Sequence, residues 1–215
     1  MPRIPIAMLE AMANQSLPSD VAFTPSVKSI QAARGSRAAY AKMESGAGWN
    51  TAISAELAAF IAAQTSVFVG TANAAGQPYV QHRGGPRGFL HVLDERTLAF
   101  AEFRGNRQFI THGNLAENAK AQLLLIDYAT RRRIKVWGTA RVVEHDAAFI
   151  EQLMPQEAAA SGEQAIVFDV AAWDANCPRH IPRLLDAEDV AIALAERDRR
   201  IAELEAEIAW LKGSA

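Results

Sequence analysis

Short apolar runs separated by turn residues dominate the middle of the chain. Such runs are typical of strands, and they occupy residues 66–72, 78–83, 89–93, 97–103, 121–127, 133–144 and 164–173. Turns over 73–76 and 94–96 join neighbouring runs, as in hairpins. About seven strands with only short helices between them favour a mainly β fold, a closed antiparallel barrel, over a parallel α/β sheet.

Helical patterns precede these strands. Residues 26–44 have a helical composition, and the Gly-Ser pair at 35–36 predicts a break into two short helices, with Ser36 as a cap of the second. Ser54 is expected to cap the next helix. The apolar stripe of that helix is formed by Leu57, Phe60 and Ile61.

The patterns divide the chain into three regions. Residues 1–53 are predicted to form an N-terminal arm with short helices, 54–185 the barrel, and 186–215 a C-terminal amphipathic helix. Within the barrel, further short helices are expected in 104–117, after a loop, and over 146–154, where the first residue is an Asp suited to capping.

The C-terminal region carries a heptad pattern. Apolar residues with one arginine recur there at alternating spacings of four and three, with charged residues on the other faces. Two interpretations stay open: an amphipathic helix that packs on its own domain, or a coiled coil between chains. The seam consists of Val190, Leu194, Arg197, Ile201, Leu204, Ile208 and Leu211.

Composition and charge exclude several classes of protein. Half of the 215 residues are hydrophobic and 21% are charged, a balance that lets a globular chain bury a core. Because 22 Lys and Arg face 24 Asp and Glu, for a net charge of −2, general nucleic-acid binding is not expected. The single cysteine, Cys177, allows no intramolecular disulfide and indicates a cytoplasmic setting. No run approaches the ~20 apolar residues that span a bilayer, so no membrane partner is expected.

Common catalytic and cofactor motifs are absent from the sequence. It contains no GxGxxG, GxxxxGK[ST], HExxH, CxxC or GxSxG pattern. The five histidines are scattered, and Cys177 with His180 supplies only two ligands, so no metal is expected. The residues give no catalytic assignment.

Arginines beside Gly and Asn recur at the ends of predicted strands, in the segments 81–85 (QHRGG), 104–108 (RGNRQ) and 131–133 (RRR). A planar guanidinium suits phosphate oxygens, and amides at a helix N-terminus add partial positive charge. If the barrel brings these segments together, they form a phosphate-binding rim. The alternative is that each arginine is a solvated surface charge.

From about residue 57 to 183, the sequence resembles the pyridoxamine 5′-phosphate oxidase-like, FMN-binding split-barrel family. The resemblance rests on SVFVGTANAAGQPYVQHRGG, on TLAFAEFRGNRQFITHGNLAENAKAQLLLID and on RRIKVWGTARVV. HRGGP, GNRQ and NCPRHIP further resemble a bacterial subgroup of the family. The resemblance implies a six- to seven-stranded antiparallel split β-barrel that forms a homodimer, with FMN bound in the cleft between the subunits.

The resemblance also implies which residues bind FMN. Arg107 matches the main phosphate ligand, and Asn106 and Gln108 stand beside it in the same turn. The residues that match positions against the isoalloxazine ring and ribityl chain are Gln81, His82, Arg83, Gly84, Ala101 and Glu102.

Later residues are implied to act across the dimer or on the substrate. Trp173 and Arg183 repeat a Trp-x9-Arg spacing that closes the flavin site from the other subunit, and Arg133 matches a position that reaches the phosphate from there. Arg179 matches an arginine that touches the substrate. His180 is a second candidate for steering the substrate, with a structural loop histidine as the alternative.

One segment departs from the oxidases. Residues 147–162, AAFIEQLMPQEAAASG, lack the Tyr, Arg and Ser that bind the phosphate of pyridoxamine 5′-phosphate in those enzymes. We therefore expect an FMN-dependent oxidoreductase that acts on a small, flat, weakly charged substrate and is not an efficient pyridoxamine phosphate oxidase. The alternatives are a non-catalytic flavin carrier or sensor, and a haem-binding protein.

Overall fold

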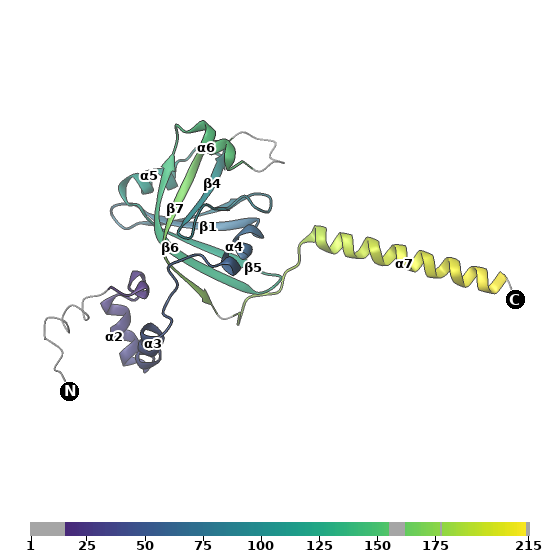
Figure 1. Ribbon diagram of the computed structural model, residues 1–215, viewed down its shortest axis with the longest axis horizontal. Coiled ribbons are helices and arrows are strands. Elements are labelled where there is room, and N and C mark those ends of the chain that lie inside the picture. Colours follow the sequence, from purple (N-terminus) through teal and green to yellow (C-terminus); the bar gives the residue numbers. More distant parts are fainter. Residues whose placement is uncertain (1–15, 155–161, 177, 214–215) are drawn as a thin grey trace. The chain divides into compact units, whose positions relative to one another are not determined.

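A computed structural model gives the fold of the chain (Figure 1) and describes residues 16–154, 162–176 and 178–213. These residues form two compact units. The first unit comprises the described residues up to 126 together with those from 133 to 176. The second comprises residues 127–132 together with those from 178 onward.

Seven strands form one sheet in the order β2-β1-β5-β6-β7-β4-β3 (Figure 1). Neighbouring strands pair in antiparallel fashion, which confirms the predicted mainly β fold. The bounds are β1 (Ser66–Ala72), β2 (Pro78–Gly84), β3 (His91–Val92), β4 (Thr97–Phe103), β5 (Lys120–Asp127), β6 (Arg132–Val143) and β7 (Gly162–Asn176).

The strand predicted over 89–93 is wrong in length, since only two of its residues form β3. Phe89 and Leu90 are buried, but the amide of Phe89 bonds to the carbonyl of Pro86 at 3.0 Å and closes a turn. The apolar run at 89–93 therefore predicted burial of these side chains correctly, but it did not indicate an extended backbone.

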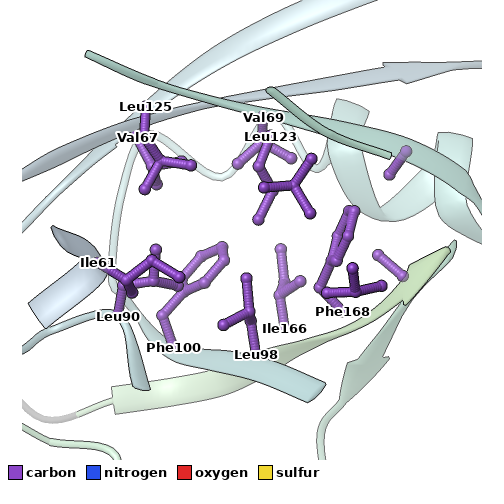
Figure 2. Packing of buried hydrophobic residues seen from close by; sticks show 14 of the residues in the cluster. Ile61, Val67, Val69, Leu90, Leu98, Phe100, Leu123, Leu125, Ile166 and Phe168 are labelled. Atoms are coloured by element: carbon purple, nitrogen blue, oxygen red, sulfur yellow. The ribbon is translucent and has the colours of Figure 1, made fainter. Parts of the chain in front are cut away.

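Alternating apolar residues make the sheet curl around a core. One side of the inner strands is mostly buried, as the pattern of β1 shows, where Val67 and Val69 point inward. Figure 2 shows residues of β1 and β5 facing residues of β4 and β7 across this core. Strands far apart in the sheet order therefore pack against each other, and the sheet wraps on itself. The labelled residues of these strands are Val67, Val69, Leu98, Phe100, Leu123, Leu125, Ile166 and Phe168.

The helices before the sheet follow the predicted pattern with one correction. A break at Gly35, where φ is 77°, separates α2 (Pro25–Ala33) from α3 (Arg37–Ser45), after the short 3₁₀ turn η1 (Pro18–Val21). Ser36 does not cap α3 with its side chain. Its backbone is already helical, and its hydroxyl lies 3.5 Å from the carbonyl of Gln31 instead.

Three further helices were expected, and all three are present. Ser54 caps α4 (Ala55–Ala62) by accepting the amide of Leu57 at 3.2 Å, and the predicted apolar stripe of α4 is buried. α5 (Ile110–Glu117) follows the loop after β4. Asp146 caps α6 (Ala147–Gln152) by accepting the amide of Phe149 at 3.0 Å.

The C-terminal helix, α7 (Ala187–Gly213), is also present and lies in the second unit. Over the described residues, no helix combines the length and the apolar character needed to cross a bilayer.

The segment between α3 and α4 is fixed on the outside of the sheet by tryptophans. The rings of Trp49 and Trp137 stack with centroids 4.5 Å apart and planes at 13°. The indole Nε1 of Trp173 donates to the carbonyl of Ala52 at 2.8 Å, and Asn50 pairs with the backbone of Trp173. These contacts hold Trp173 against its own chain.

Gly138 permits a very close approach between β6 and β7. The β6–β7 register shifts between Trp137 and Gly138, as in a β-bulge. A Cβ atom at position 138 would lie only 1.9 Å from the carbonyl oxygen of Asp169. Only glycine fits there without moving β7.

We therefore expect Gly138→Ala to lower the free energy of unfolding by about 1–3 kcal/mol or more, because the new methyl group forces the strands apart. Urea denaturation measures the change. Gly70→Ala in β1 is the matched control, since a Cβ there meets atoms no closer than 3.6 Å. Equal midpoints for both variants would contradict the assigned close approach.

Candidate functional site

A pocket of about 250 Å³ lies where β2, β4, α5 and the first residues of β7 come together. Its walls include the predicted flavin positions of β2 and β4 and those of the loop between β4 and α5. The predicted residues that it brings together are Gln81, His82, Arg83, Gly84, Ala101, Glu102, Asn106, Arg107 and Gln108.

Curling of the sheet creates this pocket. β2 is the last strand at one end of the sheet, and β4 is the second strand from the other end, so the two strands are not hydrogen-bonded neighbours. The Arg83 guanidinium of β2 nevertheless pairs with the Glu102 carboxylate of β4. This ion pair spans the gap between the two ends.

Glu102 is the centre of the polar network in the pocket. Its side chain is largely buried, and its second carboxylate oxygen pairs with Nε2 of His112 in α5. Burying a carboxylate is costly unless cations and donors compensate it, and Arg83 and His112 supply that compensation. The β4–β7 register shifts just after Glu102, at Phe103, which is a common way to direct a side chain into a site.

Two buried polar atoms of the pocket have no hydrogen-bond partner among the described residues. They are Nε of Arg83, a donor, and Oε1 of Gln164, an acceptor. Gln164 lies directly across from Glu102 in the β4–β7 pairing, and Arg83 pairs with the Glu102 carboxylate, so both residues are neighbours of Glu102. Buried polar groups are normally paired, so these two atoms mark a place for a ligand with its own donor and acceptor.

Helix α5 is held against β1 and β2 by side-chain hydrogen bonds. The hydroxyl of Thr111 donates to Oε1 of Gln81 at 2.6 Å, and Nδ2 of Asn114 donates to the hydroxyl of Thr71 at 2.9 Å. On β2 itself, Nε2 of His82 lies 2.9 Å from the hydroxyl of Ser66. The walls of the pocket are therefore fixed before any ligand binds.

The loop from β4 to α5 has an unusual backbone. Arg107 and Phe109 both have positive φ, 60° and 53°, which costs a non-glycine residue about 1–2 kcal/mol. The Arg107 guanidinium lies 5.6 Å from the centroid of the Phe109 ring, in a cation–π arrangement. Among the residues that the structure describes, no carboxylate pairs with Arg107. This arginine is therefore available for an anion.

Thr111 and His112 line the pocket but were missed in the sequence. In the sequence, only their position in the helix after the arginine-bearing turn of residues 104–108 indicated that they could lie near the pocket. The sequence pattern alone did not indicate that His112 would meet a carboxylate ten residues earlier.

Five predicted residues lie outside this pocket. Arg133 is in β6 with a buried, unpaired Nε, and Trp173 is bonded to Ala52 as described above. Arg179, His180 and Arg183 belong to the second unit, where His180 has a φ of 68°. Their roles at a neighbouring subunit's flavin or substrate stay predictions. In the described ranges, no three His, Cys, Asp or Glu side chains gather to hold a metal.

The curled antiparallel sheet with a polar pocket between its two ends defines a small β-barrel protein. The sequence model of the pyridoxamine 5′-phosphate oxidase family matches residues 53–177, and the chain belongs to that family. No curated protein matches the chain.

Solved structures with a similar fold include proteins with different ligands. A candidate pyridoxamine 5′-phosphate oxidase from Lactobacillus delbrueckii is 21% identical, covers 58% of this chain and 95% of its own, and has a TM-score of 0.45. An FMN-binding protein from Syntrophomonas wolfei is 14% identical, with coverages of 58% and 82% and a TM-score of 0.42. HutZ, the heme storage protein of Vibrio cholerae, is 14% identical, with coverages of 58% and 93% and a TM-score of 0.38. These likenesses concern the fold and assign no ligand to this chain.

The network around Glu102 can be tested by removing its charge. We expect Glu102→Gln to lower the free energy of unfolding by about 1.5–3 kcal/mol, because the partly buried Arg83 and His112 lose their charged partner. Urea denaturation of the ligand-free protein measures this change.

Glu163→Gln is the control, because Glu163 also lines the pocket but is exposed and lies 3.7 Å from Arg104. We expect less than about 1 kcal/mol for that exposed pair. Equal losses in the two variants would show that Glu102 does not hold the two ends of the sheet together.

Proposed function

We propose that this protein binds FMN in the pocket between β2 and β4 and is an FMN-dependent oxidoreductase for a small, flat substrate. The observation that carries the proposal is the composition of one pocket. It contains Arg107, which has no anionic partner among the described residues, and an unpaired donor on Arg83 and acceptor on Gln164, the residues that pair with Glu102 or lie across from it. A phosphate and a heterocyclic ring edge, the two polar ends of FMN, match these groups.

The phosphate end is assigned to the loop before α5. Arg107 would hold the phosphate through its guanidinium, which suits phosphate oxygens in a bidentate arrangement. Arg104 lies in the same loop and, within the described residues, pairs with the exposed carboxylate of Glu163 at 3.7 Å. Asn106 and Gln108 line the pocket on either side of Arg107 and would add neutral donors.

The ring end is assigned to the strands. The isoalloxazine ring carries carbonyl oxygens on both sides of an N–H group, so it can accept from Nε of Arg83 and donate to Oε1 of Gln164. Phe89, Phe100 and Ala101 supply an apolar wall for a flat ring. Both orphaned atoms would then be paired.

A second copy of the chain would complete the site. The pocket of about 250 Å³ is below the ~300–1,000 Å³ of most sites for ligands of this size. Three of the five predicted residues that lie outside the pocket, Arg133, Trp173 and Arg183, match family positions that act on the flavin of the other subunit. We therefore propose a homodimer with the flavin shared between subunits.

When bound, FMN supplies the hydride chemistry. The protein's residues bind, orient and exclude water. His112, hydrogen bonded through Nε2 to Glu102, can hold a proton inside the pocket, and Arg83 keeps the carboxylate charge compensated. Arg179 and His180 are proposed to steer the substrate. Either oxygen or a reduced nicotinamide can serve as the second reactant.

Pyridoxamine 5′-phosphate is not the proposed substrate. Helix α6 stands where the oxidases carry their donors for the substrate phosphate, and it reads AAFIEQ, apolar with one acidic residue. Glu157, a further acidic residue of this segment, lies outside the described residues. A phosphate left without cations on this side would be strongly disfavoured.

The absorbance spectrum of the purified protein tests the cofactor and the activity together. A flavin spectrum that bleaches with NADPH or with an oxidisable substrate supports the proposal. A flavin spectrum that no donor or substrate changes would favour a carrier or sensor, and a Soret band would identify a haem protein and overturn the proposal.

Arg107→Ala is expected to weaken FMN binding by roughly tenfold to a hundredfold, because one charge-assisted contact to the phosphate is lost. Fluorescence titration of the ligand-free protein measures the dissociation constant. Arg141→Ala, an exposed arginine of β6 outside the pocket, is the control. Unchanged affinity in the Arg107 variant would remove this residue from the site.

A further inference from the structure

Helix α7 carries an apolar stripe that nothing in its own compact unit covers. No residue of α7 is buried, and the seam residues Leu194, Ile201 and Leu211 are each about half exposed, at 51%, 51% and 54%. A helix of 27 residues with such a stripe is incomplete by itself, because the apolar face gains stability only when it is covered.

We propose that α7 forms a parallel, in-register, two-stranded coiled coil with α7 of a second copy of this chain. The heptad assignment follows from the alternating spacings. Position a is occupied by Leu194, Ile201 and Ile208, and position d by Val190, Arg197, Leu204 and Leu211. β-Branched residues at a with leucine at d favour two strands over three or four.

Charges beside the seam select the parallel orientation. In a parallel pair, each g residue faces the e residue of the partner five positions further on. Arg200 at g would face Glu205 of the partner subunit, and Glu207 at g would face Lys212 of the partner subunit. Both contacts join opposite charges, and symmetry forms each of them twice.

The antiparallel orientation is less favourable. It places e positions next to e positions, and two of the four e residues, Asp198 and Glu205, are acidic. Within the single chain, Arg200 bonds to Glu203 at 3.0 Å. That exposed pair contributes little, so exchanging it for a contact across the coil costs little.

Arg197 is the polar member of the seam, and its position supports the same arrangement. A d residue packs beside an e residue of the facing helix, so Arg197 would lie next to Asp198 of the partner subunit. A polar residue in a seam lowers stability but fixes the register and the number of strands. The occupant of the stripe is therefore this same sequence, since every complementary charge comes from α7 itself.

The coiled coil is independent of the flavin proposal, because no residue of α7 lines the pocket. A parallel pair has its two-fold axis along the coil, which is the symmetry of an ordinary homodimer. A chain that binds no flavin would still form it, so the two proposals fail separately.

Cysteine cross-linking of the full-length chain tests the orientation. In a Cys177→Ser background, Leu211→Cys places thiols at facing d positions, and we expect nearly complete disulfide dimers on mild oxidation at micromolar concentration. In an antiparallel pair centred on Ile201, the same thiols would be roughly 30 Å apart. Ala209→Cys, on the outer b position, is the control and should cross-link only marginally.

Charge reversal tests the g–e contacts in the Leu211→Cys background. Arg200→Glu should slow cross-linking roughly fivefold, and adding Glu205→Arg should restore the rate. Arg199→Glu is the matched control, since Arg199 also pairs with a glutamate three residues away but occupies the outer f position. Absent disulfide dimers, cross-linking equal to that of Ala209→Cys, or equal effects of the two reversals would each overturn the proposal.

Discussion

The ion pair between Arg83 and Glu102 joins two parts of the sheet that hydrogen bonding leaves apart. β2 and β4 face each other only because alternating apolar residues curl the sheet around one core. The buried carboxylate then needs both the guanidinium of β2 and the imidazole of His112. The same requirement places α5 at the pocket and sets the Arg107 loop at its rim. The candidate site is therefore a consequence of how the barrel closes.

Local patterns predicted most of this fold from the sequence. Six of the seven strands, the break at Gly35 and the caps at Ser54 and Asp146 depend on neighbouring residues and were predicted correctly. Two details were wrong because the tertiary structure overrides the local signal. Phe89 and Leu90 are buried in a turn and not in a strand, and Ser36 has a helical backbone that prevents side-chain capping.

The candidate site was predictable as a set of positions but not as a network. The arginine-rich segments at 81–85 and 104–108 do meet in one pocket, whereas 131–133 does not take part in it. The pairing of Glu102 with His112 depends on how α5 packs, and the place of Gln164 opposite Glu102 depends on the β4–β7 register; no spacing in the sequence reveals either. The residues expected from a second subunit lie outside the pocket of one chain, so their role depends on the assembly.

The central claim is that one chain holds half of a shared flavin site. Light scattering on the FMN-loaded full chain tests this claim directly when flavin absorbance is recorded on the same peak. The account predicts a flavin-containing peak with the mass of two 23.3 kDa chains and one FMN per chain. A peak with the mass of one chain and a full complement of FMN would contradict it, as would a dimer that takes up no FMN at all.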